Sequence, residues 1–144
     1  PSYDLFNWKG CHFTAFNCFE LSNIEHRARF RSKIDLLVAS EFNRDISYFS
    51  NLVESTARDI HCYVAQANDS KYGDSRVTQP TSANEKDLIK VKGGENPVIL
   101  VDTIDLNKLR EFQLKEYSGQ KTLGTFKPTP PDFEKREALK RMKR

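Results

Sequence analysis

One stretch of the sequence places a thiol where it could act as a nucleophile. Residues 13–17 form a short apolar run that ends at Cys18, and the carboxylate of Glu20 follows two residues later. A helix beginning here would direct free backbone N–H groups and the positive end of its dipole toward the thiol. Such a setting lowers the pKa of a thiol and stabilises an oxyanion. The alternative is that Cys18 is a small buried hydrophobic residue, which is the commoner role of an intracellular cysteine.

Length and composition predict a single globular domain. The chain has 144 residues, of which 30% are charged and 38% hydrophobic, so it can bury a substantial core. No apolar run approaches the roughly 20 residues that a membrane-spanning helix needs, and the first ten residues do not form a signal peptide. The three cysteines do not form a disulfide framework. We therefore expect a cytoplasmic protein with no membrane contact.

The positive charge is concentrated at the C-terminus. The chain carries a net charge of +3, but residues 121–144 alone hold eight Lys or Arg and three Asp or Glu. The preceding residues are therefore mildly acidic. Residues 125–131 are Pro-rich, and 133–144 form a basic segment that could be helical. We predict a domain at 1–118 and an extension at 119–144 that either wraps the domain or reaches a partner, including nucleic acid.

Hydrophobic patterning predicts alternating strands and helices. A helix is expected at 22–33, with Ser22 and Glu25 forming a capping box, and another at 106–117, capped by Asp105. A long amphipathic helix is expected between them. This helix should cover about residues 45–61. Strands are expected at 12–17, 35–40, 62–68, 76–79, 87–92 and 98–104. This order is typical of a layered α/β domain.

Five segments between about residues 10 and 117 resemble, in order and spacing, the C-terminal half of the carbon–nitrogen hydrolase superfamily, the nitrilases and aliphatic amidases. The first is a strand leading into a Cys-aromatic-acid turn, here Cys18-Phe19-Glu20. The other four segments are the aliphatic strand 35–40, the helix-to-strand run 57–68, the Gly-x-Ser-x-Val-x-x-Pro pattern at 73–80 and the Asp-x-Ile-Asp pattern with Leu-Arg-Glu at 102–111. The sequence departs from the family at Thr56, where an Arg is usual, and at Ser82, where a Gly is expected.

The resemblance implies a fold and a reaction. The fold would be α/β, the C-terminal half of a nitrilase-type α-β-β-α sandwich. Cys18 would attack a carbonyl or nitrile carbon and form a thioester-type intermediate, with the backbone N–H of Phe19 as one oxyanion donor. The family's catalytic Glu and Lys lie upstream of the nucleophile and have no counterpart here. Because the chain also begins at Pro1 without Met, we interpret it as an excerpt rather than a processed N-terminus.

Three further residues are candidates for binding a small amide or nitrile substrate. Glu41 and Asn43 follow a predicted strand at its C-terminal end, where α/β proteins place ligand contacts, although they could equally lie in a solvated loop. Asn68 begins a polar loop that could touch substrate or be a turn held by Asx hydrogen bonds. Cys62 is expected to be structural. The cysteines and histidines lack zinc-site spacing, so we predict no metal and no cofactor.

Two functions of different classes remain open. The first is a cysteine hydrolase acting on non-peptide carbon–nitrogen bonds. The second is a non-catalytic module that forms a homo-oligomer or associates with a polymerase. The run 67–76 and the basic tail are similar to nitrilase-like domains attached to bacterial reverse transcriptases of antiviral defence.

Overall fold

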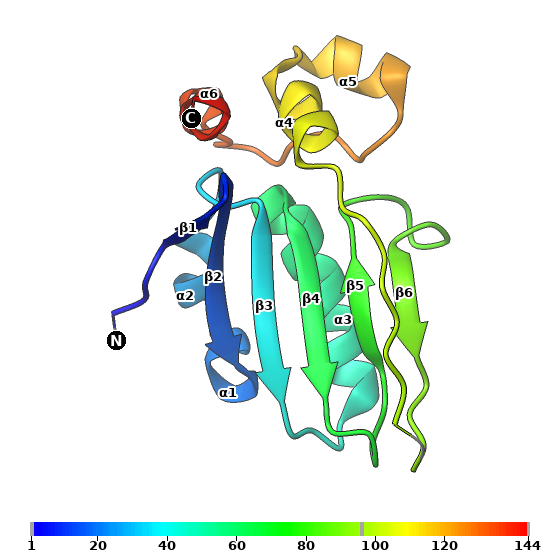
Figure 1. Ribbon diagram of the computed structural model, residues 1–144. Coiled ribbons are helices and arrows are strands. Elements are labelled where there is room, and N and C mark those ends of the chain that lie inside the picture. Colours follow the sequence, from blue (N-terminus) through cyan, green and yellow to red (C-terminus); the bar gives the residue numbers. More distant parts are fainter. Residues whose placement is uncertain (1, 96, 144) are drawn as a thin grey trace.

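A single mixed sheet organises the chain, in which the computed structural model describes residues 2–95 and 97–143 (Figure 1). The strands lie side by side in sequence order. β2, β3 and β4 are parallel to one another, whereas β1, β5 and β6 pair antiparallel with their neighbours. The strands are β1 Phe6–Trp8, β2 Cys11–Asn17, β3 Leu36–Glu41, β4 Tyr63–Asn68, β5 Ser75–Thr78 and β6 Asp87–Val91.

The helices form two groups (Figure 1). One group covers a single face of the sheet, and the other lies beyond the sheet's end near the β1–β2 turn. None of the described helices is long and apolar enough to cross a membrane. The first group is α1 Cys18–Leu21, α2 Ile24–Ala28, α3 Ile46–Thr56 and the π-helical turn η1 Ala57–His61, and the second is α4 Leu106–Leu114, α5 Tyr117–Leu123 and α6 Lys135–Met142.

The main core lies between the sheet and the first group of helices. Alternate residues of the parallel strands point into it, including Phe16, Leu37 and Val64, all of which are buried. Leu52 and Val53 of α3 pack against them. The predicted strands 12–17, 35–40 and 62–68 are therefore confirmed, and so is the amphipathic helix after Asp45, whose side chain accepts from Tyr48 N.

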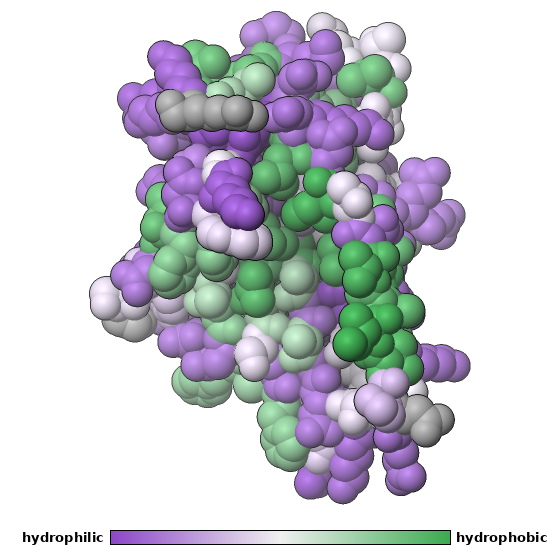
Figure 2. Space-filling view, viewed as in Figure 1, coloured by the Kyte–Doolittle hydropathy of each residue, from purple (hydrophilic) through white to green (hydrophobic). Residues whose placement is uncertain are grey.

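The opposite face of the sheet carries apolar side chains with no helix over them (Figure 2). The neighbours of the core residues along each strand must point this way, because side chains alternate between the two faces. Among them, Ala15 is exposed, and Val38, Ala65 and Val77 are only partly buried. At the amino end of this face, Leu36 and Tyr63 pack against Leu109 and Phe112 of α4. No helix among the described residues covers the rest of this open face, so the chain itself provides one sheet with helices on one side.

The strand predicted at 98–104 is wrong. Residues 97–105 run extended beside β6 in Figure 1 but form no strand ladder with any described residue. Ile99 and Val101 are 91% and 89% exposed, and Val98 and Leu100 are also exposed. An apolar, β-branched run predicts a buried strand only when a neighbouring strand supplies hydrogen bonds and cover, and the described part of the chain supplies neither here.

The helix predicted at 22–33 is also wrong in its extent and its cap. Two short helices, α1 and α2, take its place, and they are capped by Asn17 and Asn23. Ser22 is instead the residue that ends α1. Asn and Asp compete with Ser as helix N-caps, so two cap residues six positions apart divide the segment.

The C-terminal residues pack against the end of the sheet near the β1–β2 turn rather than projecting from it (Figure 1). Glu134 N donates to Ser32 Oγ at 2.8 Å, and Lys127 N donates to Pro80 O at 2.8 Å. Arg141 of α6 reaches the buried Asp35 at the start of β3. The boundary expected at 118/119 falls inside α5, so the structure offers no break there.

His61 links this C-terminal segment to the sheet and should make stability depend on pH. Its Nε2 lies 2.8 Å from Lys127 O, and Gln113 Nε2 contacts its Nδ1 at 3.1 Å. Burial disfavours the charged ring and lowers the pKa of His61 to about 4, from 6.5. The unfolded chain therefore binds the proton more readily, so stability is complete above about pH 6.5 and falls as the pH drops toward 4.

We expect a loss of about 3 kcal/mol in the free energy of unfolding across that window. Urea titrations at several pH values measure it. His61→Asn is the comparison variant, because Asn tolerates the positive φ of this position (61°) and does not titrate. If the native chain and His61→Asn lose stability in parallel between pH 6.5 and 4, His61 is not the cause.

Candidate active site

Cys18 is the first residue of α1, directly after β2 ends. Asn17 caps this helix: its Oδ1 accepts from Glu20 N at 2.9 Å, and Glu20 Oε2 accepts from Asn17 N at 3.0 Å. This reciprocal capping box fixes the strand-to-helix turn on either side of the cysteine. Glu20 thus stabilises the start of the helix, and the box predicted for Ser22 and Glu25 lies here instead.

The thiol of Cys18 is half-buried and packs against the edge of the main core. The next side chain, Phe19, is 85% exposed, and its backbone N–H lies in the first turn of α1, where N–H groups have no intrahelical acceptor. Among the described residues, no side chain hydrogen-bonds to the Cys18 sulfur. The turn therefore places a thiol beside free backbone N–H groups, and none of the described side chains lies within hydrogen-bonding distance of the sulfur to act as a general base.

The parallel strands bring the other candidate residues to the same edge of the sheet. Asn17 lies opposite Ser40 in the register of β2 and β3, and Glu41 lies opposite Asn68 in that of β3 and β4. Cys18 therefore follows β2 at the level where Glu41 ends β3. In open α/β sheets this carboxyl edge is where ligands bind.

Glu41, expected at the edge of the pocket, is buried on the helix-covered side. It is 7% exposed, and its Oε2 accepts from Gln66 Nε2 at 2.7 Å. The pKa of Glu41 is raised, because the effect of burial outweighs the hydrogen bond from Gln66 and the charge of Arg76, which both lower the pKa. The side chain is thus part of the packed interior and not of an open binding surface.

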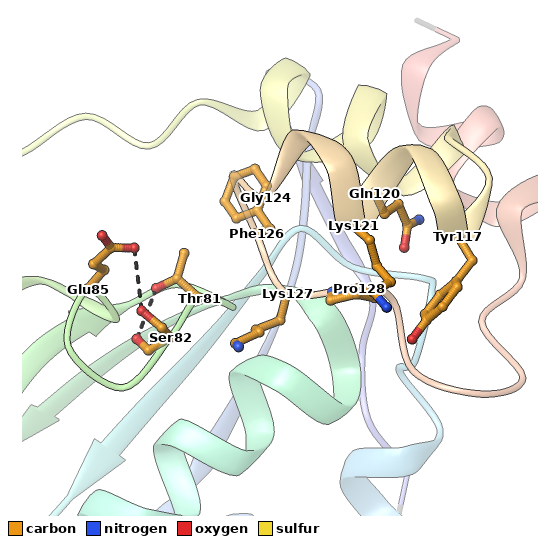
Figure 3. Close-up of a pocket in the computed structure, with 10 residues that line it drawn as sticks. All are labelled: Thr81, Ser82, Glu85, Tyr117, Gln120, Lys121, Gly124, Phe126, Lys127 and Pro128. Atoms are coloured by element: carbon orange, nitrogen blue, oxygen red, sulfur yellow. Dashed lines mark hydrogen bonds between the residues drawn. The ribbon is translucent and has the colours of Figure 1, made fainter.

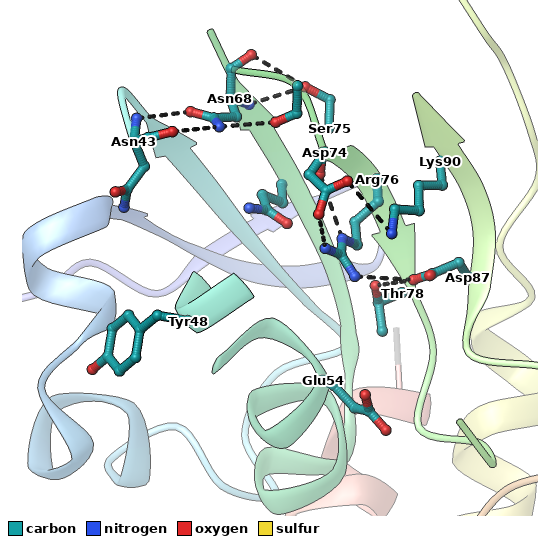
Figure 4. Close-up of polar contacts among 12 residues, drawn as sticks. Asn43, Tyr48, Glu54, Asn68, Asp74, Ser75, Arg76, Thr78, Asp87 and Lys90 are labelled. Atoms are coloured by element: carbon teal, nitrogen blue, oxygen red, sulfur yellow. Dashed lines mark hydrogen bonds and ion pairs between the residues drawn. The ribbon is translucent and has the colours of Figure 1, made fainter. Parts of the chain in front are cut away.

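Asn43 and Asn68 join two loops at this edge (Figure 4). The Asn68 side-chain amide donates to Asn43 O at 3.0 Å and to Gly73 O at 2.8 Å, and its Oδ1 accepts from Asn43 N at 2.9 Å. Both polar atoms of the amide are therefore engaged with backbone. The sequence allowed two interpretations of Asn68, a loop that touches substrate or a turn held by hydrogen bonds. The contacts of Asn68 agree with the turn.

A buried ion-pair network under β5 was not predicted from the sequence (Figure 4). The side chain of Arg76 is fully buried and donates to Asp74 at 2.8 Å, and it lies 3.7 Å from Asp87. Thr78 Oγ1 also donates to Asp87 at 2.8 Å. Side chains alternate along a strand, so Arg76 lies on the same face of β5 as Thr78, and Thr78 pairs with the core residue Val64. This alternation was the signal in the sequence that could have indicated a buried Arg76.

Two of the cavities among the described residues lie at opposite ends of the structure. One of about 530 Å³ opens beside Asn68, Ser75 and Ile99 at the carboxyl edge, and its lining does not include Cys18. The other, of about 440 Å³, lies between the loop after β5 and α5, with Tyr117 and Lys127 on its walls (Figure 3). Within the described residues, no three His, Cys, Asp or Glu side chains are grouped to hold a metal ion.

Solved structures with the same arrangement of strands and helices settle the fold. A CN-hydrolase superfamily protein from Xanthomonas campestris, with an arsenic adduct in its active site, superposes with a TM-score of 0.62. The identity is 20%, over 78% of this chain and 47% of that one. The fold is that of the nitrilase superfamily. No protein-family model matches the sequence, and no curated protein does.

A second nitrilase-superfamily protein, the amidase from Nesterenkonia AN1, agrees with this assignment. One variant of it matches with a TM-score of 0.53 and 15% identity, over 65% of this chain and 38% of that one. Another, with the acetamide moiety of fluoroacetamide added at its active-site cysteine, gives 0.51 and 17%, over 65% and 39%. The chain thus spans less than half the length of these nitrilase-like proteins.

Proposed function

We propose that this chain is the nucleophile-bearing half of a cysteine hydrolase that acts on non-peptide carbon–nitrogen bonds, such as those of amides, nitriles or carbamoyl groups. The observation that carries the proposal is the position of Cys18, at the capped turn between β2 and α1 on the carboxyl edge of a nitrilase-type sheet. Similar folds in solved structures include amidases with an active-site cysteine.

The reaction assigns separate roles to the residues of this turn. The Cys18 sulfur forms a bond to the substrate carbon, and the Phe19 backbone N–H donates to the oxygen that becomes negatively charged. For an amide, the carbon–nitrogen bond then breaks, the amine leaves with a proton, and water hydrolyses the thioester. A base for the thiol and a second oxyanion donor would come from an upstream Glu and Lys, on a second sheet that covers the open face.

A second candidate function is a non-catalytic module that associates with another copy or with a reverse transcriptase in an antiviral defence protein. The open apolar face and the exposed run at Val98–Val101 favour an association of some kind, because apolar surface of this extent is costly to leave in water. This function needs no reactive thiol. The reactivity of the Cys18 thiol therefore distinguishes the two functions.

Alkylation of the polypeptide that carries this chain tests the first function. Iodoacetamide should modify Cys18 first, because a nucleophilic cysteine is partly exposed and is held where its thiolate is stabilised. Cys11 and Cys62 are internal controls, since burial raises the pKa of both thiols. Peptide mapping by mass spectrometry identifies the order. Protection of Cys18 by an added amide would further support a substrate site.

Modification of Cys18 no faster than that of Cys11, with or without an amide present, would argue against a catalytic thiol. The association module would then be the better interpretation.

A further inference from the structure

A buried charge imbalance lies at the end of the sheet opposite Cys18. Asp35 is 0% exposed and accepts from Arg110 Nε at 2.9 Å and from Arg110 Nη2 at 2.6 Å. Arg141 Nη1 donates to the same carboxylate. Burial alone would raise the pKa of Asp35, but the two guanidinium groups hold it below its ordinary value. One carboxylate therefore faces two buried cations.

Within residues 2–95 and 97–143, no second carboxylate forms an ion pair with either arginine. The remaining partners are neutral: Arg141 Nη2 donates to Gln113 Oε1 at 2.7 Å, and Arg110 Nη2 to Gly10 O at 2.6 Å. Arg141 Nε is buried without any hydrogen-bond acceptor. Since a buried charge is costly unless it is compensated, this cluster favours binding one more negative charge.

The cluster borders a cavity of about 440 Å³ enclosed by the β1–β2 turn, the start of α4 and the end of α6. Lys9 and Lys143 add two further cations to its walls, next to Arg110 and Arg141. Among the described residues of the wall, Asp105 is the one carboxylate, and it is engaged as the N-cap of α4, where it accepts from Lys108 N at 2.9 Å. The described lining thus holds four cations against a single carboxylate at its surface.

We propose that this cavity binds a phosphate group. Arg110 lines the cavity, and its Nη1 takes no part in the bonds to Asp35, so this nitrogen is free of the carboxylate. An arginine fork matches phosphate oxygens in geometry, and lysines at the rim act on a multiply charged anion as point charges. The site lies at the amino ends of the parallel strands, so it is separate from the proposed active site and independent of it.

Calorimetric titration of the polypeptide with inorganic phosphate and with adenosine monophosphate, at equal ionic strength set with NaCl, tests the site. We expect saturable binding and a rise in melting temperature, because a ligand that binds only the folded state stabilises it. The variant Lys9→Gln/Lys143→Gln should weaken binding by about tenfold, the effect of losing one charged hydrogen bond. Tighter binding of the nucleotide identifies a phosphate ester as the ligand, and tighter binding of inorganic phosphate identifies the free ion.

The matched control is Lys71→Gln/Lys92→Gln, which removes the same charge from exposed positions near the other end of the sheet. It should bind phosphate as the native chain does. The proposal is overturned if neither ligand binds saturably, or if both double variants lose affinity equally, since the effect would then be non-specific attraction. All four lysines are on the surface, so the melting temperature without phosphate should stay unchanged and report intact folding.

Discussion

Replacing Cys18 with Ala, in the polypeptide that carries this chain, is expected to lower amide or nitrile turnover by roughly three orders of magnitude or more. The physical reason is that, in the proposed reaction, the Cys18 sulfur forms and breaks the covalent bond to the substrate carbon, and Ala cannot do so. Steady-state hydrolysis measures the loss, and mass spectrometry should show that the substrate adduct disappears. Melting temperature should change little, because Cys18 is only partly buried.

Cys11→Ala is the matched control, because it removes a partly buried thiol at the other end of β2. It should leave turnover close to that of the native protein. Turnover that survives Cys18→Ala would contradict the hydrolase. A substitution on the open face, such as Val38→Asp, should then abolish association with the partner, whereas Cys18→Ala should not.

Replacing Asp35 with Asn is expected to give the largest loss of stability. It leaves the guanidinium groups of Arg110 and Arg141 buried without a counter-ion at nearly unchanged side-chain volume. Breaking a buried ion pair in this way costs about 3–5 kcal/mol. Because Arg141 belongs to α6 and Asp35 to the start of β3, we expect the C-terminal helices to detach before the sheet unfolds.

Urea denaturation measures the total loss, and hydrogen exchange of α6 reports local detachment. The control is Asp132→Asn, an exposed carboxylate in the preceding loop, which should change stability by less than about 0.5 kcal/mol. Adding Arg141→Met to Asp35→Asn should recover part of the loss, because one buried charge is then removed. A loss below about 1 kcal/mol for Asp35→Asn would mean that water reaches the cluster and screens it.

Local signals in the sequence were sufficient for the parallel strands and for the strand-to-helix turn at Cys18. Continuous aliphatic runs such as 36–39 favour a central strand, and β3 is central here, although its Val38 side chain is only partly buried on the open face. The placement of Cys18 between a strand and a helix also follows from local patterning. Its neighbours Asn17 and Glu20 form a capping box, which involves only four consecutive residues.

Features that depend on distant partners could not be predicted in this way. The run at Val98–Val101 has the composition of a strand, but strand formation requires a neighbouring ladder that the described residues do not provide. Glu41 and Asn43 stand two residues apart in the chain, yet Glu41 is buried beside Gln66 and Asn43 lies in the edge loop. The pairing of β3 with β4, which brings Gln66 to Glu41, is a long-range contact that local patterning does not show.

The basic tail shows most clearly what only the tertiary structure decided. Composition assigned residues 119–144 to a charged extension, because Lys and Arg are usually solvated. Arg141 is instead buried against Asp35, 106 positions earlier, beside an arginine from a third element. Sequence determined the parallel strands and the turn at Cys18 through local patterns. The charge cluster arises only when β3, α4 and α6 meet, since electrostatic pairing depends on distance in space and not along the chain.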